Sequence, residues 1–249
     1  MENLILEGFH FPAFFSMFSV IYLIAYFLVF RNWNPKQRPD ATSCLISLAH
    51  GTPAVVLALS ALFENPAIGF ASENSKSQNL ALDFSIAYFT VDLLHYLVLL
   101  PSDVLFIAHH LATLFVFVTC RYLVLHGAFA ILVLLVLAEV TSACQNIWTL
   151  AGLRRGDLAV AANVYRILSP PFYVLYSIMR VFLGPLFFLK MSIYYLSGES
   201  DSVIPRWISV SWIVVVGGAI LVSILWISNL WVELVREMRK KGISEKKER

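Results

Sequence analysis

The sequence predicts an all-α polytopic membrane protein, a transmembrane helix bundle with about seven spans. The first reason is composition: 59% of the 249 residues are hydrophobic, 14% are charged, and the mean hydropathy is +0.76. Such a chain is too apolar for an ordinary soluble domain. The second reason is that the apolar residues form stretches of about 20, the length that a helix needs to cross a bilayer. The third is that Lys and Arg gather in alternate connections.

The candidate spans follow one another with short connections, and their ends are defined to within about two to four residues. In chain order they are 11–30, 44–63, 80–100, 104–125, 127–150, 170–196 and 207–232. A different division of residues 157–196 gives six or eight spans. Because proline blocks helix continuation, Pro170-Pro171 predicts a break, with an interfacial helix over 157–168 before the sixth span.

The chain divides into three parts. Residues 1–39 form an N-terminal span with a cytosolic basic loop, residues 40–235 form a membrane domain, and residues 236–249 form a basic cytosolic tail. Glu2 and Glu7 precede the first apolar run, where a cleavable signal peptide has basic residues. We therefore expect the first run to remain as a span.

The distribution of Lys and Arg predicts a lumenal N-terminus and a cytosolic C-terminus. In this orientation the cytosolic segments carry Arg31, Lys36, Arg38, Arg154, Arg155 and the tail from Arg236 to Arg249. The opposite side carries only Lys76, Arg121, Lys190 and Arg206. An odd number of spans is needed to bring all the basic segments to one side.

The C-terminal tail ends in Lys246-Lys247-Glu248-Arg249. Lysines third and fourth from the end resemble the dilysine signal by which a coat complex returns membrane proteins to the endoplasmic reticulum. This predicts residence in the endoplasmic reticulum, with the coat complex as a partner. The alternative is that the tail only sets topology and contacts anionic lipids.

Two adjacent imidazoles, His109 and His110, stand at the head of the apolar stretch LATLFVFVTC, and Asp92 and His95 lie in the preceding span. Ionisable groups at membrane depth cost a few kcal/mol, so each indicates a functional site by default. At 1.5 Å rise per residue, His95 and His109 both lie roughly 9 Å from the turn at Pro101. They therefore reach a similar depth.

Other polar residues of the spans are expected to join this cluster. Thr113 shares a helix face with His110, and Glu139 and Arg180 approach from later spans. We expect a polar cavity open toward the cytosolic leaflet that binds a membrane lipid. Its predicted lipid-binding residues are His95, Thr113, Glu139, Gln145, Asn146 and Arg180.

These segments resemble the TLC domain family, which is named for translocating-chain-associating membrane proteins, Lag-type ceramide synthases and a ceroid-lipofuscinosis membrane protein. The resemblance rests on YFTVDLLHYL, on PSDVLFIAHHLAT with His-His-x-x-Thr at 109–113, and on LAEVTSACQNIWTL. It covers roughly residues 40–235, in the order and spacing of the spans more than in identities. The chain looks most similar to small TLC-domain proteins outside the ceramide synthase branch, which are thought to bind, sense or move lipids.

The ceramide synthase branch would imply transfer of an acyl group from acyl-CoA to the amine of a sphingoid base. Its motif combines paired histidines, matched by His109 and His110, with a downstream His-Asp-x-x-Asp. At the second part this chain has Ala138-Glu139 and Ser142, so the histidine and the second acid are missing. This departure argues against direct ceramide synthesis.

An acyltransferase mechanism nevertheless has candidate residues. His109 and His110 could act as general base or acyl acceptor, and Asp92 could orient an imidazole. Acyl-CoA would then be the substrate, and no other cofactor is expected. Whether the chain is an enzyme therefore stays open.

The polar residues of the spans have three other interpretations. Polar residues in spans also tie helices together, at about 0.6 kcal/mol per hydrogen bond, so Asp92 with His95 or Arg180 can be purely structural. A metal site is not expected, because the chain lacks the repeated His-x-x-x-His boxes of membrane di-iron enzymes. A lipid or solute transporter is the third. We interpret the isolated histidines as interfacial or core polar residues; they are His10, His50 and His126. No nucleic-acid partner is indicated. The oligomeric state stays open.

Overall fold

The computed structural model describes residues 10–64 and 69–247, with side chains as far as Arg236. Three of its elements are π-helical turns, labelled η. The elements are α2 His10–Ile24, η1 Ala25–Val29, α3 Arg38–Phe63, α4 Lys76–Leu99, α5 Val104–Val118, η2 Thr119–Val124, α6 Ala128–Glu139, α7 Ser142–Arg154, α8 Ala159–Ser177, η3 Ile178–Leu183, α9 Gly184–Ser197 and α10 Arg206–Lys247.

Joined across the π-helical turns and the α6–α7 break, the described elements form 7 apolar stretches long enough to cross a membrane. They are His10–Val29, Arg38–Phe63, Lys76–Leu99, Val104–Val124, Ala128–Arg154, Ala159–Ser197 and Arg206–Arg236. The prediction of an all-α bundle with about seven spans is confirmed.

The predicted break at Pro170-Pro171 is wrong, because α8 continues through both prolines into η3 and α9. Membrane helices tolerate proline where neighbouring helices pack against them, and here side chains of α7 and α8 pack around the proline pair. The Ser169 hydroxyl donates to the carbonyl of Tyr165 at 2.6 Å, and the indole of Trp148 donates to Ser169 Oγ at 2.8 Å. Trp148 also stacks on Tyr165 and on Phe172, which lie on either side of the prolines.

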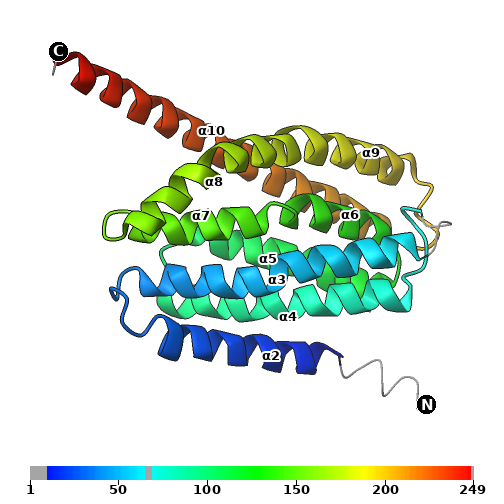
Figure 1. Cartoon of the computed structure of the whole chain (residues 1–249). Coiled ribbons are helices and arrows are strands. Elements are labelled where there is room, and N and C mark those ends of the chain that lie inside the picture. The colour runs from blue at the N-terminus through cyan, green and yellow to red at the C-terminus, as the bar shows by residue number, and fades with distance from the viewer. Residues whose placement is uncertain (1–9, 65–68, 248–249) are drawn as a thin grey trace.

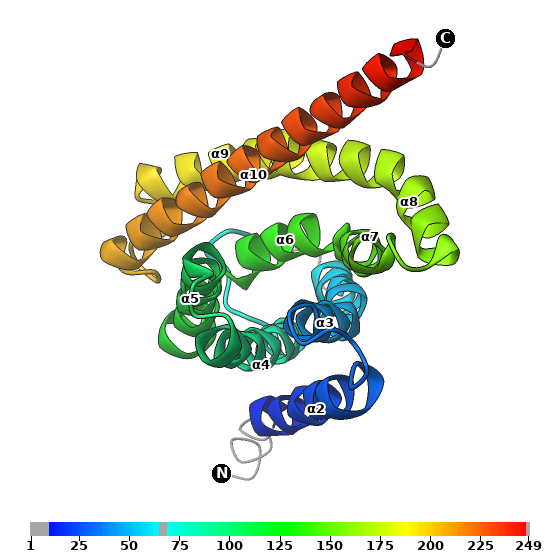
Figure 2. The same ribbon diagram turned by 90° about the vertical axis from the view of Figure 1, so that its left-hand side faces the viewer.

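The helices form a bundle with an outer layer (Figure 1). Seen along its axis, α3, α4, α5, α6 and α7 form a ring, with α2 outside it against α4 (Figure 2). The long helix from α8 to α9 and helix α10 cover the side of the ring formed by α5, α6 and α7 (Figure 2). The turns after η1, α4 and α7 lie at the same end of the bundle as the projecting C-terminal part of α10 (Figure 1).

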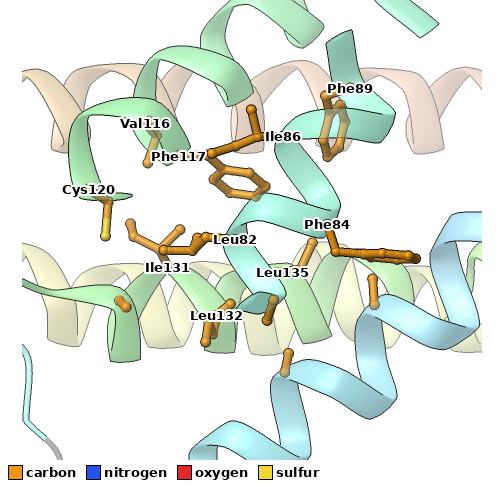
Figure 3. Packing of buried hydrophobic residues seen from close by; sticks show 14 of the residues in the cluster. Leu82, Phe84, Ile86, Phe89, Val116, Phe117, Cys120, Ile131, Leu132 and Leu135 are labelled. Carbon is orange, nitrogen blue, oxygen red and sulfur yellow. The ribbon is translucent and has the colours of Figure 1, made fainter. Parts of the chain in front are cut away.

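Helix α4 supplies the centre of the core (Figure 3). It starts at a capping box, in which Ser75 Oγ accepts from the backbone N–H of Gln78 and the Gln78 side chain accepts from the N–H of Ser75. Close packing holds membrane helices together, since lipid tails are as apolar as the side chains. The labelled residues of this cluster come from three segments. They are Leu82, Phe84, Ile86 and Phe89 of α4, Val116, Phe117 and Cys120 from α5 and η2, and Ile131, Leu132 and Leu135 of α6.

Candidate functional site

Asp92 of α4 and His110 of α5 form a buried pair, with Nε2 of the imidazole 2.9 Å from Oδ2 of the carboxyl group. The Ser43 hydroxyl donates to Asp92 Oδ1 at 2.9 Å, and the Tyr88 hydroxyl donates to Oδ2 at 3.3 Å. Asp92 is thereby hydrogen-bonded to groups from α3, α4 and α5. It joins these three helices inside the ring.

Both ring nitrogens of His110 are engaged. Nδ1 lies 2.8 Å from the carbonyl oxygen of Phe106, which can only accept, so Nδ1 carries a proton. The bond to Asp92 is then made either by an imidazolium with a carboxylate or by a neutral imidazole with a carboxylic acid. In both states, neither nitrogen of His110 can take a proton from a substrate while these bonds are kept.

His109 has the opposite surroundings. Within the described part of the chain its ring makes no hydrogen bond, and its packing partners include the rings of Phe89 and His110. The ring lines a half-enclosed pocket of about 130 Å³ between the helix ring and the outer layer. The adjacent histidines therefore differ in their surroundings: His110 bonds to another helix, while His109 lines a cavity.

The pocket is mainly apolar with a few polar groups. Its walls come from α4, α5, α6, η3, α9 and α10. The ionisable or hydroxyl-bearing lining residues are His109, Thr113, Glu139, Arg180 and Ser223. A mostly apolar cavity with a few polar groups is typical of a small-molecule site.

Glu139 reaches the pocket from the break between α6 and α7. Its Oε2 is buried without a hydrogen-bond partner and lies 3.9 Å from Nδ1 of His50. This Nδ1 atom has no hydrogen-bond partner either. Gly51 allows α3 to approach this break: a Cβ there would lie 2.8 Å from Ser142 Cβ and 3.2 Å from Glu139 Oε2. The position of the carboxyl group thus depends on a glycine in another helix.

Arg180 enters from the π-helical turn η3. Its Nη2 donates to the carbonyl of Ala138 at 2.8 Å, and its guanidinium lies over the ring of Tyr176. Its Nε is buried without a partner. Arg180 is near Glu139 in the pocket wall, yet among the described residues no ion pair joins the two, and Asp92 pairs with His110 instead.

Three predicted lipid-binding residues lie elsewhere than in the pocket wall. His95 Nδ1 is 3.3 Å from the Tyr22 hydroxyl, between α4 and α2. Asn146 donates to Ser47 Oγ at 2.8 Å and to the carbonyl of Ser142 at 2.9 Å. Gln145 is half-buried and does not line the pocket. Their part in lipid binding stays a prediction.

Two further ionisable groups are buried: His50, in agreement with its interpretation as a core polar residue, and Asp83, which the sequence reasoning did not single out. His50, interpreted as interfacial or core polar, is fully buried beside Glu139 and stacks on Tyr88 at 4.0 Å. Asp83 binds Arg121 through two hydrogen bonds, of 2.9 and 3.2 Å. Their residue types alone could have indicated both positions, since ionisable residues inside spans are rare.

Two predictions concern the metal and the tail. Within the described residues, no group of three His, Cys, Asp or Glu side chains is arranged to hold a metal ion. Lys246 and Lys247 end α10, but their side chains lie outside the described part of the structure. The retrieval signal therefore stays a prediction.

Comparison with known proteins identifies relatives of the chain. The family profile of the TLC domain matches residues 40–232. A TLC domain-containing protein of Arabidopsis thaliana is 62% identical over 234 residues, which cover 93% of this chain and 92% of the relative. No solved structure matches.

Proposed function

The chain belongs to the TLC domain family, and from this premise we propose that it binds a membrane lipid in the pocket lined by His109, Glu139 and Arg180. By holding or sensing that lipid it influences the lipid composition of the membrane. It acts without ceramide synthase activity. The resemblance inferred from the histidine pair and its neighbouring segments is confirmed at the level of the family.

The observation that supports this proposal is the pocket itself. It lies among helices long and apolar enough to cross a membrane, and its lining combines apolar walls with His109, Glu139 and Arg180. A lipid has the matching composition, an apolar chain joined to a polar head. Polar groups buried at membrane depth usually mark the path of a ligand.

A second candidate function, CoA-dependent N-acyl transfer, is favoured by one observation: the imidazole of His109 faces the pocket without a hydrogen bond in the described residues. His110 does not support it, because both of its nitrogens are engaged. The missing histidine and acid around Glu139 also argue against it.

Location and orientation belong to the same proposal. We infer residence in the endoplasmic reticulum, a lumenal N-terminus and a cytosolic tail. The support is that Arg31, Lys36, Arg154 and Arg155 lie in or beside turns at the end of the bundle from which α10 projects (Figure 1). Positive charge on one side of a membrane protein is typical of the cytosolic side.

The test is native mass spectrometry of the full-length protein purified from membranes. Ala219, on α10, lines the pocket, whereas a Cβ at the neighbouring Gly218 would meet nothing within 4 Å. Wild type and the control Gly218→Trp are expected to retain a bound lipid, and Ala219→Trp is expected to lose it. The same preparations are incubated with labelled acyl-CoA.

Equal lipid retention in Ala219→Trp and Gly218→Trp would overturn lipid binding in this pocket. A labelled product made by wild type and lost in His109→Ala would establish acyl transfer in its place. Lipid retention without any labelled product supports the proposed function.

A further inference from the structure

The pocket has a polar end and an apolar end. The lining residues of three helices, which do not all run in the same direction, place the polar end at the same side of the pocket. On α5 the lining runs from His109 to Phe117, on α6 from Ile131 to Glu139, and on α10 from Val215 to Ser223. Each interval is eight residues, or roughly 12 Å of helix. Because α5 is antiparallel to α6 and α10, the polar residue of each pair lies toward the same end of the bundle (Figure 1).

The polar end brings together a carboxyl group and a guanidinium group, since Glu139 and Arg180 both line the pocket. Glu139 Oε2 and Arg180 Nε are both buried without hydrogen-bond partners. A ligand head that hydrogen-bonds to the carboxyl group of Glu139 and to the guanidinium of Arg180 gains affinity, because hydrogen bonds to charged groups are stronger than those between neutral groups. The two side chains carry opposite charges, and together they attract no net charge.

The size of the pocket limits the ligand to one chain. A buried cavity of about 150 Å³ holds a molecule the size of benzene, and this pocket has about 130 Å³. It therefore accommodates a compact head and the first part of a single acyl chain. The rest of the chain leaves through the open side.

We propose that the ligand is a single-chain lipid with an uncharged, hydroxyl-bearing head, of the monoacylglycerol kind. One hydroxyl donates to Glu139, and a hydroxyl or ester oxygen accepts from Arg180. The chain lies toward Phe117, Ile131 and Val215. This inference rests on the proposed lipid-binding function and specifies its ligand.

The test compares three oleoyl lipids on the full-length protein in detergent. Tritiated monooleoylglycerol is displaced by unlabelled monooleoylglycerol, by methyl oleate, which has no donor, or by oleoyl lysophosphatidate, which is anionic. Wild type is expected to bind monooleoylglycerol about tenfold more tightly than either competitor, since tenfold corresponds to about 1.4 kcal/mol. Such a difference matches one unpaired buried group.

Two variants test the charge balance. Glu139→Gln leaves the charge of Arg180 unopposed and is expected to shift the preference by about tenfold toward lysophosphatidate. Arg180→Gln leaves the opposite charge and is expected to weaken lysophosphatidate further. Glu199→Gln makes the same chemical change as Glu139→Gln at an exposed position, and is expected to keep the wild-type ratio. Elution of each variant as a single species shows that it is folded.

Two outcomes contradict the inference: tight binding of lysophosphatidate by wild type, or an unchanged ratio in both Glu139→Gln and Arg180→Gln. If lysophosphatidate binds tightly and Ala219→Trp abolishes this binding, the pocket binds lipid and only the uncharged head is wrong. If Ala219→Trp and Gly218→Trp bind each of the three lipids equally well, the proposed function itself fails.

Discussion

Nε2 of His110 lies 2.9 Å from Oδ2 of Asp92, and both side chains are at least 96% buried, with exposures of 4% and 3%. The pair links α4 to α5, and the Ser43 hydroxyl on the other carboxyl oxygen extends this link to α3. Removing one partner leaves the other buried without the hydrogen bond that joins the two. Such a loss costs far more than the net contribution of the intact pair.

Asp92→Ala is therefore expected to lower the free energy of unfolding by about 3 kcal/mol. The measurement is the midpoint of unfolding of the purified protein in increasing sodium dodecyl sulfate. Asp201→Ala is the control, because Asp201 forms an exposed ion pair with Arg206 at 3.4 Å, and such pairs contribute about 0–1 kcal/mol. Equal losses in the two variants would contradict a structural role for Asp92.

His109→Ala and His110→Ala are expected to fail in different ways. His110→Ala removes one buried hydrogen bond of 2.9 Å and one partly buried hydrogen bond of 2.8 Å, and should lower stability by about 2 kcal/mol. His109→Ala removes one side chain from the pocket wall. This variant should keep wild-type stability, while its lipid retention should change. Thermal unfolding and native mass spectrometry of both variants measure these effects, and the reverse pattern would refute the assignment.

Gly51→Ala is expected to destabilise the protein by about 1–3 kcal/mol, because the added methyl overlaps Ser142 and forces α3 from the α6–α7 break. Lipid retention should fall as well, since Glu139 shares this contact. Gly156→Ala is the control, where a Cβ meets nothing within 4 Å. A Gly51→Ala protein as stable as the control would show that the contact relaxes without cost.

Topology can be tested with a single glycosylation acceptor, since the sequence contains no Asn-x-Ser/Thr triplet. Asn74 is unsuitable as the acceptor, because its side chain donates to Cys120 and accepts from the backbone of Ala128. Gly198→Asn creates an Asn-Glu-Ser triplet with Glu199 and Ser200. Gly198 has φ +87°, which asparagine tolerates better than most residues.

A gel shift removed by endoglycosidase is expected for Gly198→Asn, on the side proposed as lumenal. The paired variant carries Gly156→Asn and Leu158→Thr in the turn between α7 and α8, and it should remain unmodified. Modification of the second variant without the first would reverse the proposed orientation.

The spans were predictable because membrane crossing depends on local composition and length. The roles of His109 and His110 were not, because adjacent helical residues point about 100° apart and only the packing of α4 and the outer layer decides what each faces. The continuity of α8 was missed for a similar reason. Trp148, which lies 21 residues before Ser169 in the chain, donates to its hydroxyl and stacks on residues on both sides of the prolines.

The site was predictable in part. His109, Thr113, Glu139 and Arg180 do line one pocket. The contact between His50 and Glu139 depends on the close approach of α3 at Gly51, which is a property of backbones in contact. Nothing in the spacing of apolar residues along one helix reports such an approach.

The π-helical turn η3 sets the phase of the sixth span. A π turn holds one residue more than the corresponding α turn, so the faces of α8 and α9 are offset from those of an uninterrupted α-helix by about 100°. If all the residues from Ile178 to Leu183 instead formed an ordinary α-helix, the whole of α9 would turn by this angle relative to α8. The wall around Gly184 and the packing of Tyr195 on Trp212 could not both survive that rotation, so the position of α9 in the bundle depends on the π-helical form of this short segment.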